Sequence, residues 1–386
     1  MNNAVHFGAG VIGRGFIGDL LHATGYQVTF VEVSKQLVKQ INETNSYDLY
    51  LIDNNYEKKV IDYVQAISPV EDEQCVIDMI VNGTIVTTSV WADNLPKIAH
   101  ILAKGLKQRM AKTDQKINVI ACENALFATD MLKREILNCG VDITEQELNR
   151  IASFPNAAVD RMVFGKLVDG KRAVDIGKNY ELVIERDKLA NPNSEPIKGA
   201  IYTDNLHKFL ERKLYITNCS HAYAAYMGYL KGYDNVQDAL ADKTIYQQVL
   251  AAVHESADML LAKYNFGKKD LEDYIQFVLG RFMTEGIQDP ITRVARSPIR
   301  KLDSTDRLVA PALQCEKFGM ENTYLCRGIA AALLFKNPED SQAVEMNDYI
   351  NDNGIEQAVL HYTKIDKNSK TYTNVLSHFH NLIQNK

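Results

Sequence analysis

The stretch from Lys213 to His221, Lys-Leu-Tyr-Ile-Thr-Asn-Cys-Ser-His, places an amine, a carboxamide and an imidazole within nine residues. In a helix, at about 100° per residue, Asn218 lies about 140° and His221 about 80° around the axis from Lys213, so the three share one face. The axial distance from Lys213 to His221 is then about 12 Å, much of which the lysine stem can span. The trio could therefore act on one small polar ligand. The alternative is a solvated lysine and an ordinary hydrogen-bonded histidine.

The residues that follow favour the chemical interpretation. Residues 222–230 are small, aromatic or aliphatic, and a helix of this composition is buried nearly all round. A lysine and a histidine that enter it need partners or a function, because burial disfavours their charged forms. Desolvation readily lowers a lysine pKa toward neutrality, which makes Lys213 a candidate general base.

The composition limits the class of protein. The chain has 386 residues, 46% hydrophobic and 24% charged, which suits a globular protein of two or three domains. Its net charge of -6 gives no basic footprint for nucleic acid, and it has no apolar run of about 18 residues to span a membrane. We find no signal peptide and expect a cytoplasmic enzyme, either a monomer or a small homo-oligomer. The six cysteines include no Cys-x-x-Cys and the nine histidines no His-Glu-x-x-His, so we expect neither disulfides nor a metal site.

The N-terminus predicts a dinucleotide site. Residues 4–7 indicate a buried strand, Gly8-Ala9-Gly10-Val11-Ile12-Gly13 follows, and a helical pattern continues to about Gly25. In this context Gly-x-Gly-x-x-Gly is a Rossmann fingerprint, in which a tight turn lets the backbone approach a pyrophosphate at the helix start. The alternative is a phosphate-free βαβ unit with a glycine turn. We expect the cofactor to contact Phe7, Gly8, Ala9, Gly10, Val11, Ile12, Gly13, Arg14 and Glu32.

Glu32 predicts that the cofactor is NAD. It lies near the end of a second strand, residues 27–33, and 19 residues after Gly13. A carboxylate there accepts hydrogen bonds from the adenosine ribose hydroxyls and repels a phosphorylated ribose. The positive charge of the nearby Lys35 weakens the argument against NADP, because it would attract the phosphate on the ribose of that cofactor.

The remaining pattern predicts an α/β fold, with an N-terminal Rossmann doubly wound sheet in residues 1–200 and a mostly α-helical domain in residues 201–386. The boundary follows the loop 191–196, and a capping box at Thr144 and Glu147 opens a helix. We expect strands at 47–52, 60–67, 84–88, 117–121 and 173–186, a helix at 91–110, and helices near 235–264, 269–286, 305–335 and 340–363.

Two further segments place polar residues in an apolar context. Asn124 follows the expected strand 117–121, whose end faces the ligand crevice of a doubly wound sheet, although a simple turn asparagine is equally compatible. Residues 154–161 contain Asn156, Asp160 and Arg161, and the last two could form a structural ion pair.

The sequence resembles the polyol-specific long-chain dehydrogenases along essentially its whole length. Three stretches carry the resemblance: Val-His-Phe-Gly-Ala-Gly-Val-Ile-Gly-Arg-Gly-Phe-Ile-Gly at the start, residues 154–161, and Lys213-x4-Asn218-x2-His221. The resemblance implies NAD-dependent interconversion of D-mannitol 1-phosphate and D-fructose 6-phosphate, with no metal. One departure is that the family often has aspartate where this chain has Glu32.

The resemblance also implies roles for individual residues. Lys213 is the general base, Asn218 polarises the developing oxyanion, and His221 orients the lysine or the substrate. Asn124 assists at the carbonyl oxygen, and we expect Asn156, Asp160 and Arg161 to contact substrate. The rival functions are a related dehydrogenase of an unphosphorylated polyol or hexuronate, and a regulatory protein that binds NAD without turnover. A sensor would have no need of a base.

A basic run is our candidate for the substrate phosphate. Residues 293–301, Arg-Val-Ala-Arg-Ser-Pro-Ile-Arg-Lys, are the densest positive stretch in an acidic protein, and we expect much of it to be loop. Arginine matches phosphate oxygens bidentately, so we assign the phosphate to Arg296 and Arg300 before Arg293. The alternative is a solvated basic face paired with Asp289, Asp303 and Asp306.

Overall fold

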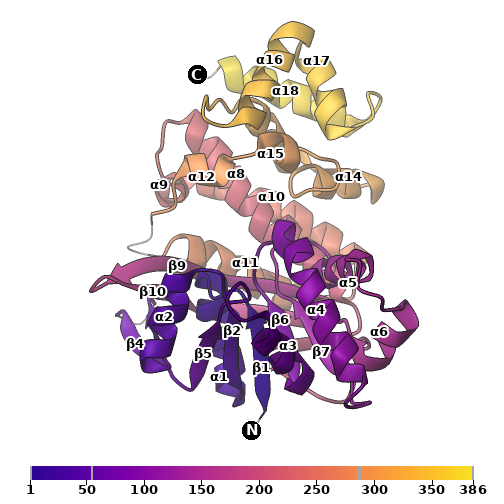
Figure 1. Cartoon of the computed structure of the whole chain (residues 1–386). Coiled ribbons are helices and arrows are strands. Elements are labelled where there is room, and N and C mark those ends of the chain that lie inside the picture. Colours follow the sequence, from indigo (N-terminus) through magenta and orange to yellow (C-terminus); the bar gives the residue numbers. More distant parts are fainter. Residues whose placement is uncertain (1, 54, 285–287, 385–386) are drawn as a thin grey trace. The chain divides into compact units, whose positions relative to one another are not determined.

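A six-stranded parallel sheet forms the centre of the N-terminal part (Figure 1). The computed structural model describes residues 2–53, 55–284 and 288–384. The strand order matches the 3-2-1-4-5-6 order of dinucleotide-binding sheets, so the expected Rossmann fold is confirmed. From one edge to the other the strands are β5 (Val64–Ile67), β2 (Gln27–Val31), β1 (Asn3–Phe7), β6 (Ile85–Thr88), β7 (Ile117–Ala121) and β8 (Ala152–Ser153).

The strands of this sheet contribute to two hydrophobic cores, because successive side chains point to opposite faces. On β1, Ala4 packs on one face, whereas Val5 and Phe7 pack on the other. The core on the Ala4 face includes helices α1 (Asp19–Thr24) and α2 (Lys35–Thr44), and the opposite core includes α3 (Glu73–Asn82), α4 (Leu95–Met110), α5 (Ala128–Asn138) and α6 (Glu145–Ile151).

A second sheet covers the face that carries α1 and α2. Its main order is β11-β10-β3-β4, and β9 pairs with β10 in a long antiparallel hairpin. Residues of β3 and β10 share a core with the glycine-loop helix, so the hairpin lies against the nucleotide-binding strand-helix unit. The bounds are β3 (Tyr47–Leu51), β4 (Glu57–Ile61), β9 (Ala157–Val168), β10 (Lys171–Glu185) and β11 (Ile201–Thr203).

One strand expectation is wrong. The apolar run 60–67 was expected to be a single strand, but it contains the end of β4 and all of β5, which belong to different sheets. The chain turns between them at Tyr63, which has a φ of 52°. The strand 117–121 and the capping box of Thr144 and Glu147 are confirmed. The helix expected at 91–110 is observed as a short turn, η2 (Ala92–Asn94), followed by α4.

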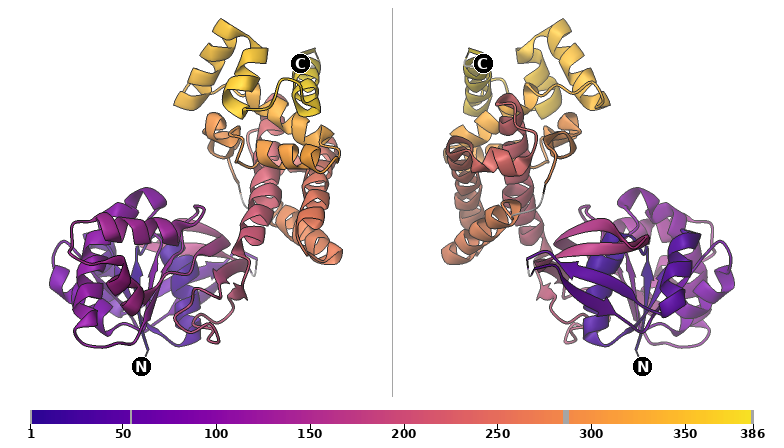
Figure 2. Two further views of the ribbon diagram at one scale, coloured as in Figure 1. Left: turned by 90° about the vertical axis from the view of Figure 1, so that its right-hand side faces the viewer. Right: turned by 90° about the vertical axis from the view of Figure 1, so that its left-hand side faces the viewer.

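Helices make up the C-terminal part, which forms a compact unit of its own (Leu210–Lys386; Figure 2). The expectation of a mostly α-helical second domain is confirmed. Its central helix α8 (Cys219–Leu230) packs against α9 (Val236–Ala241), α10 (Lys243–Lys263), α12 (Ile291–Ala295) and α15 (Thr323–Leu333). The other elements are α7 (Leu206–Arg212), η3 (Lys213–Asn218), α11 (Lys268–Phe282), α13 (Pro298–Lys301), α14 (Val309–Lys317), α16 (Ser341–Asn353), α17 (Ile355–Ala358), η4 (Val359–Thr363) and α18 (Lys370–Gln384). Residues 285 and 286, the last two of the helix expected at 269–286, lie outside the described residues. Within the described residues, no helix is long and apolar enough to cross a membrane.

A buried ion group ties the glycine-loop helix to the hairpin. Asp19, at the start of α1, accepts a hydrogen bond from Arg161 of β9 at 2.6 Å and another from Lys59 of β4 at 2.6 Å. The Asp19 and Arg161 side chains are only 5% and 4% exposed. Arg161 Nη1 and Nε also donate to the carbonyl oxygens of Gly15 and Gly177, so two of its three guanidinium nitrogens are held within this unit.

Replacing Asp19 by alanine should destabilise the protein strongly, because it leaves the buried charge of Arg161 without its carboxylate. We expect a loss of about 3–5 kcal/mol in the free energy of unfolding, measured by urea titration followed by circular dichroism. Asp62→Ala, which removes an exposed partner of His22, is the matched control and should change stability by less than about 1 kcal/mol. Equal effects of the two substitutions would contradict this account.

Candidate active site

The glycine loop between β1 and its helix can close only because two of its residues lack side chains. Gly8 has a φ of +97°, and a Cβ there would lie 2.6 Å from the Ser89 carbonyl oxygen. A Cβ on Gly13 would lie 2.0 Å from the Gly8 carbonyl oxygen. A larger residue at Gly13 would force the loop open, and one at Gly8 would push the loop away from the backbone that follows β6.

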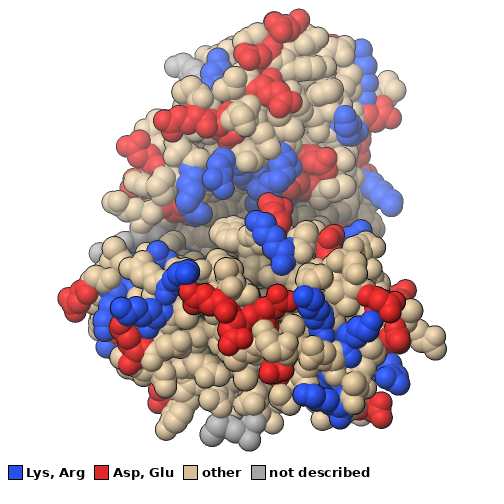
Figure 3. All heavy atoms as spheres, in the orientation of Figure 1, with Lys and Arg blue, Asp and Glu red and all other residues tan. Residues whose placement is uncertain are grey.

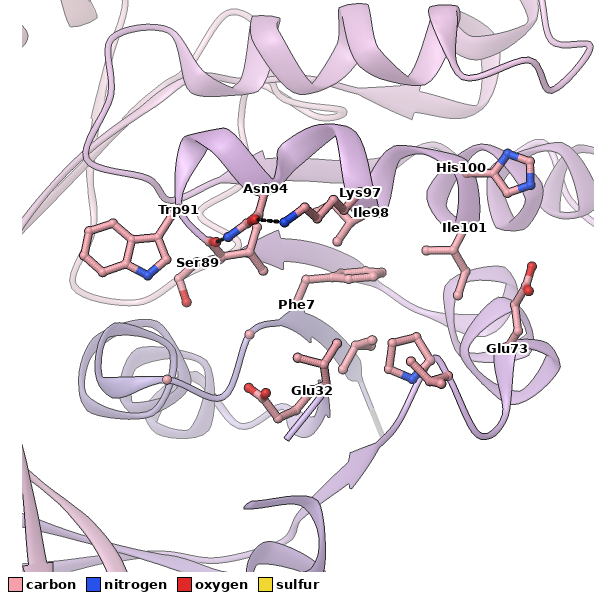
Figure 4. Close-up of a pocket in the computed structure, with 17 residues that line it drawn as sticks. Phe7, Glu32, Glu73, Ser89, Trp91, Asn94, Lys97, Ile98, His100 and Ile101 are labelled. Atoms are coloured by element: carbon pink, nitrogen blue, oxygen red, sulfur yellow. Dashed lines mark hydrogen bonds between the residues drawn. The ribbon is translucent and has the colours of Figure 1, made fainter. Parts of the chain in front are cut away.

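The loop borders a cavity of about 650 Å³ at the carboxyl ends of β1, β2 and β6 (Figure 4). A Cβ on Gly10 would meet no atom within 4 Å, so the backbone is accessible at this residue, as close approach of a pyrophosphate requires. In Figure 4 Trp91 lies at one end of the cavity, with Glu73 and His100 at the other. The lining comprises Phe7, Gly8, Gly10, Val31, Glu32, Val33, Pro69, Val70, Glu73, Ser89, Val90, Trp91, Asn94, Lys97, Ile98, His100 and Ile101.

Glu32 is held in place at this cavity by the backbone. Its Oε2 accepts a hydrogen bond from the Ala9 amide at 2.8 Å, and its Oε1 accepts one from the Ser34 amide at 2.8 Å. Each carboxylate oxygen has a second lone pair, which remains able to accept a hydrogen bond from a ribose hydroxyl. The residues around the cavity therefore fit a dinucleotide with an unmodified ribose.

Arg14 stabilises the glycine loop through hydrogen bonds to backbone carbonyl oxygens. It is 2% exposed, and its Nε and Nη1 donate to the carbonyl oxygens of Ala9 and Arg172 at 2.8 and 2.7 Å. Burial lowers the pKa of Arg14. Its Nη2 has no hydrogen bond within the described part of the chain, and the residue borders a second, smaller cavity together with Gly10, Val11 and Arg172. Contact between Arg14 and the cofactor stays a prediction.

Two buried polar side chains organise the strand ends beside the loop. His6 lies 2.7 Å from Thr87 Oγ1 and 2.8 Å from Ser89 Oγ, and burial lowers its pKa to about 3, which keeps the ring neutral. Glu123 accepts hydrogen bonds from the amides of Val90 and Trp91, each at 2.9 Å. This carboxylate holds Trp91 in its positive-φ conformation, 71°, at the rim of the cavity.

The candidate substrate residues of the N-terminal unit have different surroundings. Asn124 is exposed just beyond β7, and its assignment stays a prediction. Asn156 is fully buried: its Oδ1 accepts from the amides of Thr129 and Asp130, and its Nδ2 donates to Asp130 and Glu185. These contacts cap the start of α5.

The expected pairing of Arg161 with Asp160 is wrong. Arg161 pairs instead with Asp19, as described above. On β9, Asp160 lies opposite Glu181 of β10 in the hairpin register. Substrate contacts of Asn156, Asp160 and Arg161 stay predictions, and the contacts of Asn156 and Arg161 already account for their burial.

Lys213, Asn218 and His221 lie on one continuous helical stretch formed by α7, η3 and α8. Lys213 begins and Asn218 ends η3, a π-helical segment, and such i→i+5 segments inside helices are frequent at functional sites. Between residues 211 and 228 only Lys213, Leu214, Asn218 and His221 are partly exposed, while all others are buried. All three candidate polar residues are therefore among the few positions at which this buried stretch is accessible.

His221 belongs to a hydrogen-bonded chain in the C-terminal unit. Its Nε2 lies 2.9 Å from Asp289 Oδ2, and its ring stacks on Phe282 with centroids 4.4 Å apart. Arg293 donates from Nε and Nη2 to the two oxygens of Asp289 at 2.7 and 2.6 Å. The bidentate face of Arg293 is thus occupied by Asp289, one of the acidic partners named in the alternative for the basic run.

The rest of the basic run lies in short helices, so the expectation that much of it is loop is wrong. Only Arg296 and Ser297 separate α12 from α13. Burial lowers the pKa of Arg300, and the nearby charge of Arg307 lowers it further. Burial likewise lowers the pKa of Lys301 to about 7, and its ammonium donates to the Arg296 carbonyl oxygen. Figure 3 shows lysine and arginine side chains gathered on the C-terminal unit at the level of α8 and α12.

Sequence reasoning missed several groups. Ser89 and Trp91 follow β6, and the rule that strand ends line the crevice could have identified them. The backbone carbonyl of Arg172, on the hairpin, accepts a hydrogen bond from Arg14, and Arg307 lies near Arg300 of the basic run, but neither residue has a local sequence signal. No group of three or more histidine, cysteine, aspartate or glutamate residues in the described ranges could hold a metal ion.

The Rossmann sheet, the glycine loop and Glu32 at the cavity define a dinucleotide-binding protein. The chain belongs to the mannitol dehydrogenase family: the model of the mannitol dehydrogenase Rossmann domain matches residues 2–197, and that of the mannitol dehydrogenase C-terminal domain matches residues 205–386.

Curated relatives are similar to this chain along nearly its whole length, and two solved structures share its fold. The chain is 40% identical to mannitol-1-phosphate 5-dehydrogenase of Caldanaerobacter subterraneus over 96% of its own length and 95% of that protein. It is 38% identical to the enzyme of the same name from Oceanobacillus iheyensis over the full length of both. Pseudomonas fluorescens mannitol 2-dehydrogenase, solved with NAD and D-mannitol, shares the fold with a TM-score of 0.76 at 19% identity, covering 100% of this chain and 92% of that one. A D-sorbitol dehydrogenase shares the fold with a TM-score of 0.82 at 16% identity, and the match covers 99% of this chain and 93% of that one.

Glu32→Ala should weaken NADH binding and reduce the discrimination against NADPH. Loss of charge-assisted hydrogen bonds worth about 1.5–3 kcal/mol corresponds to roughly a ten- to hundredfold rise in Kd. Trp91 is the only tryptophan of the chain and lines the cavity, so quenching of its fluorescence measures binding directly. Glu43→Ala, which removes an exposed partner of Lys39 and lies outside the cavity lining, is the control. Equal affinity of the wild-type protein for NADH and NADPH would show that Glu32 does not select the cofactor.

Proposed function

We propose that this chain is an NAD-dependent oxidoreductase that interconverts D-mannitol 1-phosphate and D-fructose 6-phosphate. The observation that carries the proposal is the helical stretch 211–228, which is buried except at Lys213, Leu214, Asn218 and His221. The names of full-length relatives at 38–40% identity support the phosphorylated substrate. A cytoplasmic location fits this chemistry, because charged sugar phosphates and dinucleotides do not cross membranes unaided.

The protein groups divide the work of the reaction as follows. NAD, which Gly8, Gly10 and Glu32 at the cavity would hold, would supply the hydride acceptor for oxidation and, in its reduced form, the hydride donor for reduction. Lys213, as the neutral amine, takes the hydroxyl proton and in reduction returns it to the carbonyl oxygen. Asn218 donates its amide N–H to the same oxygen as negative charge develops there, which stabilises the transition state more than the ground state. His221 accepts a hydrogen bond that orients the reacting hydroxyl or the lysine.

The test of the reaction is an absorbance assay at the reduced-nicotinamide band with paired substrates. Fructose 6-phosphate should oxidise NADH rapidly, whereas fructose and hexuronates should be poor substrates. Faster turnover of an unphosphorylated sugar would indicate a polyol or hexuronate dehydrogenase instead. NADH binding without turnover of any of these sugars would favour a regulatory protein.

Lys213→Ala should lower kcat by about 10²–10⁴-fold, the range typical of general acid–base catalysis, while NADH binding is retained. In the wild-type protein, alcohol oxidation should accelerate as pH rises, because only the neutral amine can take the proton. Lys231→Ala, at the other end of α8, is the matched control, since Lys231 pairs with Asp242 and should leave activity unchanged. Near-normal activity of a folded Lys213→Ala variant would remove lysine from the mechanism.

Arg296→Ala and Arg300→Ala should each raise the KM for fructose 6-phosphate about ten- to a hundredfold, because each removes a charge-assisted hydrogen bond worth roughly 1.5–3 kcal/mol. Activity on free fructose, which has no phosphate, should hardly change. The measurement is steady-state kinetics of both variants on both sugars. Equal losses on the two sugars, or no loss on either, would place the phosphate elsewhere.

A further inference from the structure

A buried carboxylate in the C-terminal unit binds two side chains for which the sequence predicts different functions: orientation of the reacting groups by His221 and phosphate binding by Arg293. Asp289 binds the imidazole of His221 and the guanidinium of Arg293 at the same time. We propose that Asp289 is a positioning residue, which holds His221 in the neutral tautomer with the proton on Nε2 and leaves Nδ1 as an acceptor for a substrate hydroxyl or the Lys213 ammonium. The part concerning substrate rests on the proposed function.

The position of Asp289 does not depend on its own side chain. Its amide donates to Gln237 Oε1 at 2.9 Å, and its carbonyl oxygen accepts from the Val236 amide at 3.0 Å. The carboxylate, 9% exposed, is therefore presented by an anchored backbone. Phe282 stacks on the His221 ring with an interplanar angle of 14°, which restricts its rotation. The hydrogen bond and the stacking together hold the imidazole in one orientation.

The charges around this pair determine which nitrogen carries the proton. Burial acts to raise the pKa of Asp289, but the hydrogen bonds from His221 and Arg293 outweigh it, so the pKa is lowered. The carboxylate is thus ionised and can only accept hydrogen bonds. Its contact with His221 Nε2 then requires a proton on that nitrogen.

The other imidazole nitrogen is consequently an acceptor. Burial lowers the pKa of His221, Arg293 and Arg281 lower it further, and Asp289 opposes them without reversing the shift. The ring is therefore neutral at pH 7, with a lone pair on Nδ1. This nitrogen has no hydrogen bond within the described residues, and the side chain remains 25% exposed. It is available to a ligand, as an orienting histidine requires.

The proposal is tested first on the wild-type protein. Long-range ¹H–¹⁵N NMR, with the His221 signals assigned by their loss in His221→Ala, should show a protonated Nε2 and an unprotonated Nδ1 at pH 7. A proton on Nδ1 would overturn the proposal. Because this measurement needs no substrate, it stands even if fructose 6-phosphate proves not to be the substrate.

Kinetics of Asp289→Asn then separate positioning from plain structural support. The variant should lower kcat about ten- to a hundredfold, the range found when metal-bound histidines lose the carboxylate that orients them, and NMR should show both His221 tautomers. In the reductive direction, where the competent form of Lys213 is the ammonium, the acid limb of the kcat profile should move to lower pH, because the lost carboxylate raised the His221 pKa. Glu272→Gln, which breaks the exposed His254–Glu272 contact of 3.1 Å, is the matched control. An unchanged tautomer and an unshifted acid limb in a folded variant would contradict the proposal.

Discussion

The arrangement of this protein depends on the cost of placing polar groups in an apolar helix. A lysine, an asparagine and a histidine can interrupt such a helix only where each reaches open surroundings or a partner. The stretch from η3 into α8 meets this requirement by leaving Lys213, Leu214, Asn218 and His221 partly exposed while the flanking residues are buried. The surrounding helices bury the rest of α8, and Tyr223 and Tyr226 are fully enclosed among them. A stable core and accessible polar side chains thus share one helical stretch.

Buried or half-buried carboxylates hold several loops in place by accepting hydrogen bonds from their backbone amides. Glu32 binds the amides of Ala9 and Ser34 at the cofactor cavity, and Glu123 binds those of Val90 and Trp91. In the C-terminal unit, Asp340 accepts from the Ser297 amide between α12 and α13 at 2.7 Å. Loop backbone has no regular partners of its own, so these side chains satisfy its amides and hold the lining residues in position.

Local patterns predicted the parts of the fold that local physics determines. The glycine fingerprint, strand β7 and the capping box of Thr144 and Glu147 each depend on a few neighbouring residues. The division of residues 60–67 between two sheets has no glycine or proline to signal it, because the turn occurs at Tyr63. The partner of Arg161 is Asp19, 142 positions away, and the π-helical turn at Lys213 leaves no mark in an apolar periodicity. Such features depend on tertiary contacts that spacing alone does not encode.

The central claim is that the chain transfers a hydride to the carbonyl carbon of a ketose phosphate. Deuterium transfer tests it most directly: fructose 6-phosphate is incubated with NADH that carries deuterium on the transferable position of C4, and the product is examined by mass spectrometry and NMR. The account predicts a hexitol phosphate with one deuterium, located at the former carbonyl carbon. An unlabelled product, or unchanged fructose 6-phosphate in the presence of a protein that binds NADH, would contradict it.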